Sequence, residues 1–269
     1  MKNEQFKTIT TLSILLVITL GIASFFGIFV PGTYERETAS MAAQGIGQDI
    51  VNLFFALPIL IISLVFVHRN SKIAWLIFSG TLFYIMYSFV IYGFGVNFNR
   101  MFLIYCATLG LSLYALILVM IKLSSMDAGA WFEDKIPHRP IGIYMIVVAG
   151  LFYLLWLKDV VPAIITNTTP KSVSDYKLLV NPVHVIDMAF ALPGLIISAL
   201  LLLKKQSMGY ILTPIFLVFI ILLTIALAGM VIVVKMQGIA EDMSIAAIFL
   251  VMAVISSIFL YRFLKHLKS

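Results

Sequence analysis

Two short polar stripes hold the residues of this sequence that are best suited to chemistry. The first stripe contains Asp49 and Asn52, and the second contains His184 and Asp187. Both pairs are spaced by three positions, which places their members on one face of a helix. A carboxylate one turn from an imidazole can share a proton with it and orient the ring. Such a pair suits a proton relay, a cation site or a general base.

The same residues also fit a purely structural role. Asn181-Pro182 has the pattern of a helix N-cap followed by proline at the first helical position. His184 and Asp187 would then lie in the first two turns of that helix, and Asp49 would begin its own helix. Acidic residues are favoured there by the helix dipole. The sequence leaves both interpretations open, and it also allows an ion pair between Asp49 and His184.

Other motifs give no support to metal, cofactor or nucleic-acid chemistry. Cys106 is the single cysteine, and the four histidines lack the spacing of a zinc or haem site. We therefore expect no metal and no cofactor. The net charge of +6 comes without a basic patch interleaved with aromatic residues, so we also expect no nucleic-acid partner.

Composition indicates that the stripes belong to a membrane protein, where they would lie at the outer ends of their helices. Apolar residues make up 62% of the chain and charged residues 11%, whereas soluble domains carry about 25% charged residues. A membrane-spanning helix needs roughly 20 apolar residues. We predict an all-α polytopic membrane protein, in contact with the lipid bilayer, with eight transmembrane helices near residues 10–30, 50–67, 73–95, 101–121, 141–161, 183–203, 208–234 and 243–261.

The distribution of basic residues predicts an orientation. Of the 18 Lys and Arg residues, twelve fall on the side of the two termini and six on the other. Basic residues are enriched in cytoplasmic loops. We therefore expect a multi-pass protein of the cell membrane (inner or plasma) with both termini in the cytoplasm. The long loops 31–48 and 162–182 would lie outside.

An internal repeat divides the chain. Residues 55–63 read FALPILIIS and residues 190–198 read FALPGLIIS, at an offset of 135. Four helices separate the two copies, so both cross the membrane in the same direction, as in parallel repeats. We predict two parallel four-helix repeats, residues 1–122 and 139–269, joined by a cytoplasmic linker at 123–138. Pro58 and Pro193 would act as hinges or as fixed kinks.

The remaining polar candidates belong to the third span. Tyr84, Tyr87 and Tyr92 cluster there with Asn97 and Asn99, and an aromatic belt at the membrane surface is our interpretation of most of these tyrosines. Small residues, among them Gly80 and Gly194, are expected to let the helices pack closely.

Three segments carry a resemblance to other proteins. Gln48-Asp49-Ile50-Val51-Asn52-Leu53, Leu57-Pro58 and His184-Val185-Ile186-Asp187 resemble an uncharacterised family of prokaryotic multi-pass integral membrane proteins. The resemblance implies an integral membrane protein with the same repeated organisation. It implies no activity.

For function, the leading hypothesis is transport or permeation of a small solute or ion between the two repeats. Asp49, Asn52, His184 and Asp187 would converge at the outer mouth of the second and sixth spans and bind the substrate. The alternative is a non-catalytic sensor or assembly partner of another membrane protein, acting through the outer loops. A membrane-embedded enzyme using His184 and Asp187 is less favoured, because no nucleophile or metal-ligand set accompanies them. A cavity reaching Ser63 and Ser198 would favour transport.

Overall fold

The computed structural model describes residues 2–133, 135–239 and 242–268, and no strand occurs among them. Within these residues, eight helices are long and apolar enough to cross a membrane, which confirms the predicted all-α polytopic class. The second and sixth of these are each built from three consecutive segments. The spans are α1 (Lys2–Phe29), α2–η1–α3 (Ala39–Val51, Asn52–Ala56, Leu57–His68), α4 (Lys72–Gly95), α5 (Phe102–Ser124), α6 (His138–Thr166), α8–η3–α9 (Pro182–Ile186, Asp187–Ala191, Leu192–Leu203), α10 (Ser207–Met236) and α11 (Ser244–Leu264). Two short helices, η2 (Ala128–Trp131) and α7 (Lys171–Ser174), lie in the connections.

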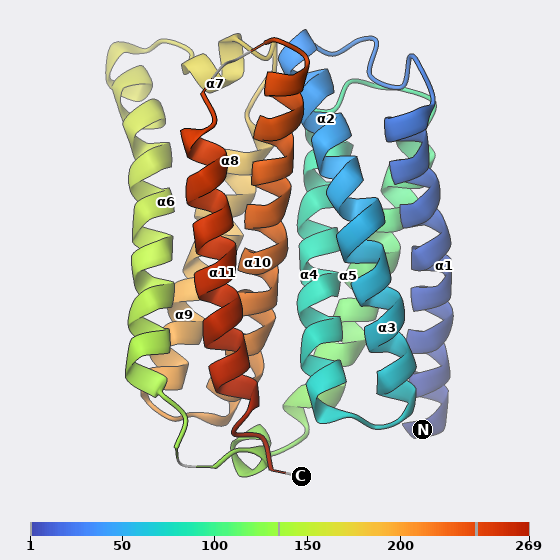
Figure 1. The fold of residues 1–269 in the computed structure, drawn as a ribbon, viewed down its shortest axis with the longest axis vertical. Helices are drawn as coiled ribbons and strands as arrows, with labels where there is room; N and C mark the ends of the chain where they lie inside the picture. Colours follow the sequence, from blue (N-terminus) through green and yellow to red (C-terminus); the bar gives the residue numbers. More distant parts are fainter. Residues whose placement is uncertain (1, 134, 240–241, 269) are drawn as a thin grey trace.

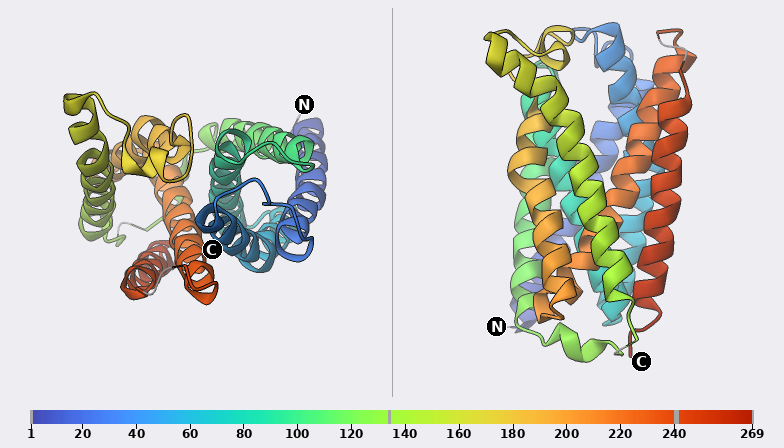
Figure 2. Two further views of the ribbon diagram at one scale, coloured as in Figure 1. Left: turned by 90° about the horizontal axis from the view of Figure 1, so that it is seen from above. Right: turned by 90° about the vertical axis from the view of Figure 1, so that its left-hand side faces the viewer.

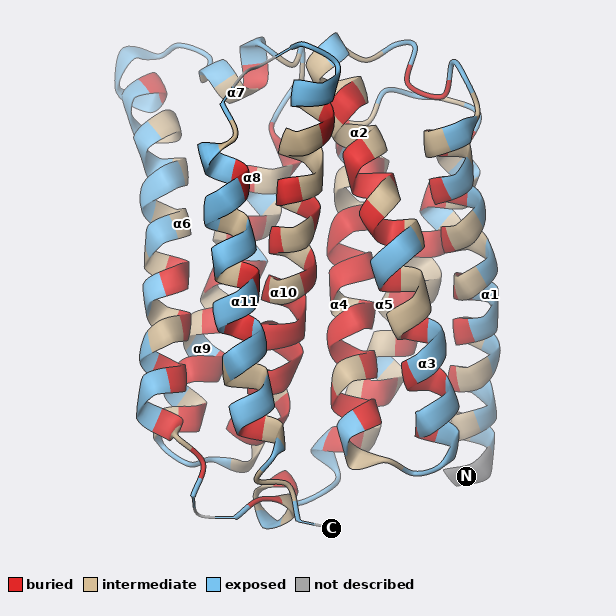
Figure 3. Ribbon diagram, in the orientation of Figure 1, coloured by how far each residue is buried: buried red, intermediate tan, exposed pale blue. Residues whose placement is uncertain are grey.

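The spans form two groups that stand side by side, α1–α5 and α6–α11, here called the first and second helix groups (Figure 1). Both chain ends lie at one end of the molecule, the terminal end. The connections 30–38 and 167–181 lie at the opposite end, the loop end. Buried residues concentrate on α4 and α10, which face each other between the groups (Figure 3).

Glycines allow α10 to approach the first helix group closely. A Cβ atom at Gly80 of α4 would lie 2.8 Å from the backbone oxygen of Ile215. A Cβ atom at Gly47 of α2 would lie 2.7 Å from the backbone oxygen of Gly229. Small residues have this role wherever membrane helices pack without a hydrophobic driving force.

The two helix groups differ in how far they close. In the first group α1 packs along α5, so the four spans form a ring (Figure 2). In the second group α6 packs on α9 and α11 packs on α10. A side-chain hydrogen bond joins α6 to α11, between Tyr144 and Ser256 at 2.6 Å. Among the described residues, α6 does not pack along α11 as α1 packs along α5, so the second group is an open arrangement.

A five-residue π-helical turn precedes each repeat proline. The turns η1 and η3 begin at Asn52 and Asp187, at the offset of the sequence repeat. In each turn the backbone carbonyl of the first residue accepts from the amide five residues later, in Leu57 and in Leu192. Proline lacks an N–H and cannot continue the regular ladder, and a π turn is one way to absorb the mismatch.

The turns after α3 and α9 also match at the same offset. Asn70 and Lys205 adopt left-handed backbone conformations, with φ of 58° and 53°. The amide of Ser71 then donates to Phe66 O at 3.2 Å, and the amide of Gln206 donates to Leu201 O at 3.0 Å. These matched turns support the predicted parallel repeat, whose boundaries stay a prediction.

The loop predicted for residues 31–48 is wrong in its second half. Thr38 caps α2 by accepting from the amide of Met41, and the helix begins at Ala39. Asp49 therefore lies three turns inside a helix and is fully buried. The prediction that Asp49 begins a helix is also wrong. At the other connection α6 continues through Pro162 to Thr166.

The connection between the helix groups joins the C-terminal tail at the terminal end. Phe132 and Leu267 form an isolated antiparallel bridge. The amide of Glu133 donates to His266 O at 2.9 Å, and the amide of Lys268 donates to Trp131 O at 2.7 Å. We call this arrangement the clasp.

Candidate functional site

Asp49 is held in a cage of side chains from its own helix group. Its carboxylate accepts hydrogen bonds from the hydroxyls of Tyr34 and Tyr92, the latter at 2.9 Å. A Cβ atom at Gly27 of α1 would fall on this carboxylate, so only glycine leaves room for it. Tyr34 lies in the connection outside the spans, where burial and then the nearby Asp49 raise its pKa well above the usual value. Its hydroxyl consequently stays a donor.

Asn52 lies one turn below Asp49 and joins a second polar network. Its Oδ1 accepts from the hydroxyl of Tyr84 at 3.0 Å and from Nε2 of Gln48 at 3.2 Å. Gln48 Nε2 also donates to the Tyr84 hydroxyl at 2.7 Å. Nδ2 of Asn52 is buried and has no hydrogen-bond partner among the described residues. The start of the π turn at Asn52 thus carries an unused donor.

Asp187 occupies the equivalent position in the second helix group, and its partners come from both groups. One carboxylate oxygen accepts from the Tyr87 hydroxyl of α4 at 2.8 Å. The other accepts from Nε1 of Trp156 on α6, also at 2.8 Å. Asp187 is 3% exposed. Its carboxylate therefore ties α4 of the first group to α6 of the second.

His184 pairs with neither carboxylate. Its ring packs against Trp156, with the centroids 4.7 Å apart, and its Nε2 is buried without a partner in the described part of the chain. Within the described residues the one ion pair joins Glu133 to His266. The predicted Asp49–His184 pair and the shared proton between His184 and Asp187 are therefore wrong. The predicted cap is present, since Asn181 Oδ1 accepts from the amide of Val183 at 3.0 Å ahead of α8.

The tyrosines of α4 are the site residues that the sequence interpretation missed. Tyr84, Tyr87 and Tyr92 are at most 4% exposed, and each donates its hydroxyl to a polar stripe residue. The aromatic-belt interpretation is wrong for all three. A signal was available in the spacing, because Tyr84, Ser88 and Tyr92 recur every four residues on one helix face.

A cavity of about 310 Å³ lies between the two helix groups at the loop end. Its wall contains five aromatic side chains, which are Tyr34, Tyr87, Tyr92, Trp156 and Tyr176. Four of these donate to Asp49 or Asp187. The two carboxylates thus lie directly behind the cavity wall, although they do not meet each other as the sequence predicted.

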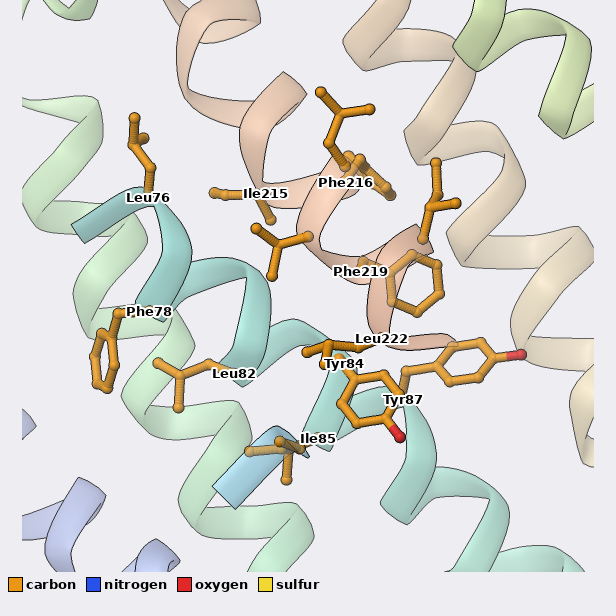
Figure 4. Packing of buried hydrophobic residues seen from close by; sticks show 14 of the residues in the cluster. Leu76, Phe78, Leu82, Tyr84, Ile85, Tyr87, Ile215, Phe216, Phe219 and Leu222 are labelled. Atoms are coloured by element: carbon orange, nitrogen blue, oxygen red, sulfur yellow. The ribbon is translucent and has the colours of Figure 1, made fainter. Parts of the chain in front are cut away.

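Phe83, Phe216 and Phe219 form an aromatic layer that packs against Tyr87 of the cavity wall. Phe219 packs edge-on against Tyr87 at 5.0 Å and against Phe83 at 4.8 Å. Figure 4 shows these α10 side chains facing the buried residues of α4. Neither Ser63 nor Ser198 lines the cavity. Ser63 instead borders a separate apolar groove of about 480 Å³, and Ser198 bonds to Thr213 at 3.4 Å.

The helices and the buried polar site define an integral membrane protein of the polytopic all-α class. Comparison of the chain with protein-family models, with curated proteins and with solved structures finds no match in any of the three. Among the described residues, no three His, Cys, Asp or Glu side chains come together as a metal site would require.

Proposed function

We propose that this protein binds a small solute between its helix groups and moves it across the membrane. The observation that carries the proposal is the cavity of about 310 Å³ at the loop end, whose wall is built from both groups. Small-molecule sites have volumes of roughly 300–1,000 Å³ and combine apolar walls with a few polar groups. Here the polar groups include Gln44, Gln48 and Ser88.

The irregular helices support the same function. Transporter sites commonly lie at interrupted helices between repeats, where freed backbone groups line a cavity. The π turns η1 and η3 begin at Asn52 and Asp187, whose hydrogen-bond donors Gln48 and Tyr87 line this cavity. Their matched positions would let the two groups rearrange around the bound solute.

Passage across the membrane requires a path through the aromatic layer. In the described structure, the layer consists of side-chain packing between α4 and α10, without hydrogen bonds between their backbones. Separating the groups there would break no helix. We propose that this structure is the state open toward the loop end.

Orientation is the second part of the proposal. We place the loop end outside the cell and the two termini in the cytoplasm, because basic residues favour the terminal end. In a Cys106→Ala background, Ser174→Cys should react with an impermeant maleimide in intact cells, and Ser125→Cys should react only after lysis. Both serines are exposed. The reverse labelling pattern would invert the orientation.

The transport test begins with identification of the solute. Purified protein would be incubated with a cell extract, washed and denatured, and the released solutes identified by mass spectrometry. The identified solute would then be assayed for uptake into proteoliposomes. Ser88→Phe fills the cavity and should abolish both binding and uptake. Gly93→Phe is the matched control on α4, because a side chain at Gly93 meets open space.

Three outcomes are distinguishable. Binding and uptake that Ser88→Phe removes and Gly93→Phe retains would support transport. Specific binding without uptake would overturn transport and favour the sensor alternative. Equal solute retention by all three proteins would show that the cavity binds nothing specific.

A further inference from the structure

We infer that the cavity between the helix groups selects a small organic cation, such as a primary or quaternary amine. The inference rests on the proposed function and names its substrate class. It draws on the charges that line the cavity, on the two carboxylates behind the wall and on the way the aromatic donors are used.

The charge of the lining has one sign. Among the described residues that line the cavity, Glu37 is the only charged side chain, and none is lysine, arginine or histidine. Glu37 is held by Asn97, whose backbone amide donates to Oε1 at 2.6 Å and whose Nδ2 donates to Oε2 at 3.0 Å. A carboxylate is therefore fixed at the cavity wall near the loop end.

Asp49 and Asp187 add two further acidic groups that no described cation compensates. Both are buried, and neither forms an ion pair with any described residue. Their hydrogen-bond partners are neutral hydroxyls and an indole. An ionised carboxylate away from water is unfavourable unless a positive charge compensates it. A cationic solute in the cavity would contact the aromatic donors of each acid and would favour the ionised carboxylates behind them.

Four aromatic donors line the cavity, although Tyr92 also stacks on Phe89 and Trp156 also packs against His184. Tyr34, Tyr87 and Tyr92 use their hydroxyl protons on the carboxylates, so these hydroxyls present only lone pairs to the cavity. Tyrosine and tryptophan faces attract ammonium groups, and the attraction grows when water is excluded. An anion would meet three acids and, among the described lining residues, no base. A neutral solute would use the walls but would leave the acids uncompensated.

The experiment measures charge selectivity directly, without knowledge of the natural solute. Ser88→Cys in a Cys106→Ala background places a thiol on the cavity wall. Its modification rate is measured in purified protein with three methanethiosulfonates, which carry a trimethylammonium group, a sulfonate group or an uncharged methyl group. Each charged rate is divided by the uncharged rate at the same site. Ser125→Cys, at the exposed terminal end, supplies the reference ratio.

We expect the cation-to-anion rate ratio of the Ser88→Cys thiol to exceed that of the Ser125→Cys thiol at least about tenfold, as in clefts lined by one sign of charge. Glu37→Gln should lower the excess several-fold. Glu35→Gln, the matched charge change in the same connection, should leave it within about twofold, because Glu35 does not line the cavity. Equal rates for all three reagents would overturn the cation inference and leave the solute site in place. Failure of the uncharged reagent as well would overturn both the inference and the proposed function.

Discussion

Asp49 and Asp187 lie beside the same cavity, but the two helix groups hold them differently. The donors to Asp49 come from the connection after α1 and from α4, and all belong to the first group. Asp187 accepts one hydrogen bond from Trp156 of its own group and the other from Tyr87 on α4 of the first group. The first arrangement stabilises one group internally. The second stabilises the contact between the groups.

The packing of the two groups follows the same division. The first group closes because α1 packs along α5, whereas α6 and α11 of the second group are joined through side chains such as Tyr144 and Ser256. A closed ring can surround a carboxylate with donors from its own group. In the open group α6 does not pack along α11, and Asp187 accepts one of its hydrogen bonds from the neighbouring group. Substitutions at Asp49 should therefore affect folding, and substitutions around Asp187 should affect the association of the groups.

Gly27→Ala should give the largest effect. The new Cβ displaces the Asp49 carboxylate from both tyrosines. Overpacking and the lost hydrogen bonds should together lower the free energy of unfolding by about 4 kcal/mol. Denaturant unfolding in detergent measures it. Gly150→Ala is the control, because a Cβ atom there meets nothing within 4 Å. Equal stability of the two variants would show that the Asp49 cage is loose.

Removal of the carboxylates comes next. Asp49→Ala leaves the buried hydroxyls of Tyr34 and Tyr92 without an acceptor and should cost about 3 kcal/mol. Asp187→Ala should cost about 2 kcal/mol, because Trp156 is only half-buried and can reach other acceptors. Thermal unfolding of both variants in the same detergent gives the comparison. A larger loss at Asp187 would reverse the proposed division between the groups.

Tyr87→Phe should weaken the contact between groups by about 1 kcal/mol, the value of one hydrogen bond. Its distinguishing effect is on local opening rather than on global unfolding. Amide hydrogen exchange should rise on η3 and on the facing part of α4. Tyr92→Phe, which removes a bond inside the first group, should raise exchange in α2 instead. The same exchange pattern in both variants would contradict the claim that Tyr87 links the two groups while Tyr92 acts within the first.

Asp187→Asn should have the smallest effect, below about 1 kcal/mol. Trp156 Nε1 is only a donor and so fixes the amide carbonyl on its side, while the amide nitrogen can donate to the Tyr87 oxygen. Stability measured by thermal unfolding should therefore stay close to that of the unsubstituted protein. A loss as large as that of Asp187→Ala would show that the negative charge itself holds the two groups together.

The sequence was sufficient for the membrane class and the number of described spans, because apolar length alone decides them. It was also sufficient for the cap at Asn181, where a short-range pattern specifies the local structure. It failed for residues 39–48, which contain glutamines and glycines that hydropathy assigns to a loop. Those residues are helical because tertiary partners satisfy them, with Gly47 against Gly229 and Gln48 bonded to Tyr84. The Thr38 cap is a local signal for the start of this helix, but the partners that bury Gly47 and Gln48 lie far away in the sequence.

The sequence predicted the polar residues of the candidate site but not their partners, because the partners lie on other helices. The four stripe residues are all buried, whereas the sequence had left open whether they cap helices at the membrane surface. Their partners were assigned wrongly because charge complementarity suggested a histidine, whereas the structure supplies aromatic donors from α4, from α6 and from the connection after α1. Hydroxyl donors on a neighbouring helix are recognised only after the helices have been placed. The role of these residues in binding stays a prediction.

The clasp has a practical consequence for producing this protein. The last described residues, Leu267 and Lys268, pair with the backbone of the connection between the groups, and the Lys268 carbonyl also accepts from Nζ of Lys72 at 3.2 Å. A purification tag fused directly after them would crowd this paired backbone, and a truncation after His266 would remove the contacts of Leu267 and Lys268. The protein should therefore be expressed with its tag at the N-terminus, or with a flexible spacer before a C-terminal one.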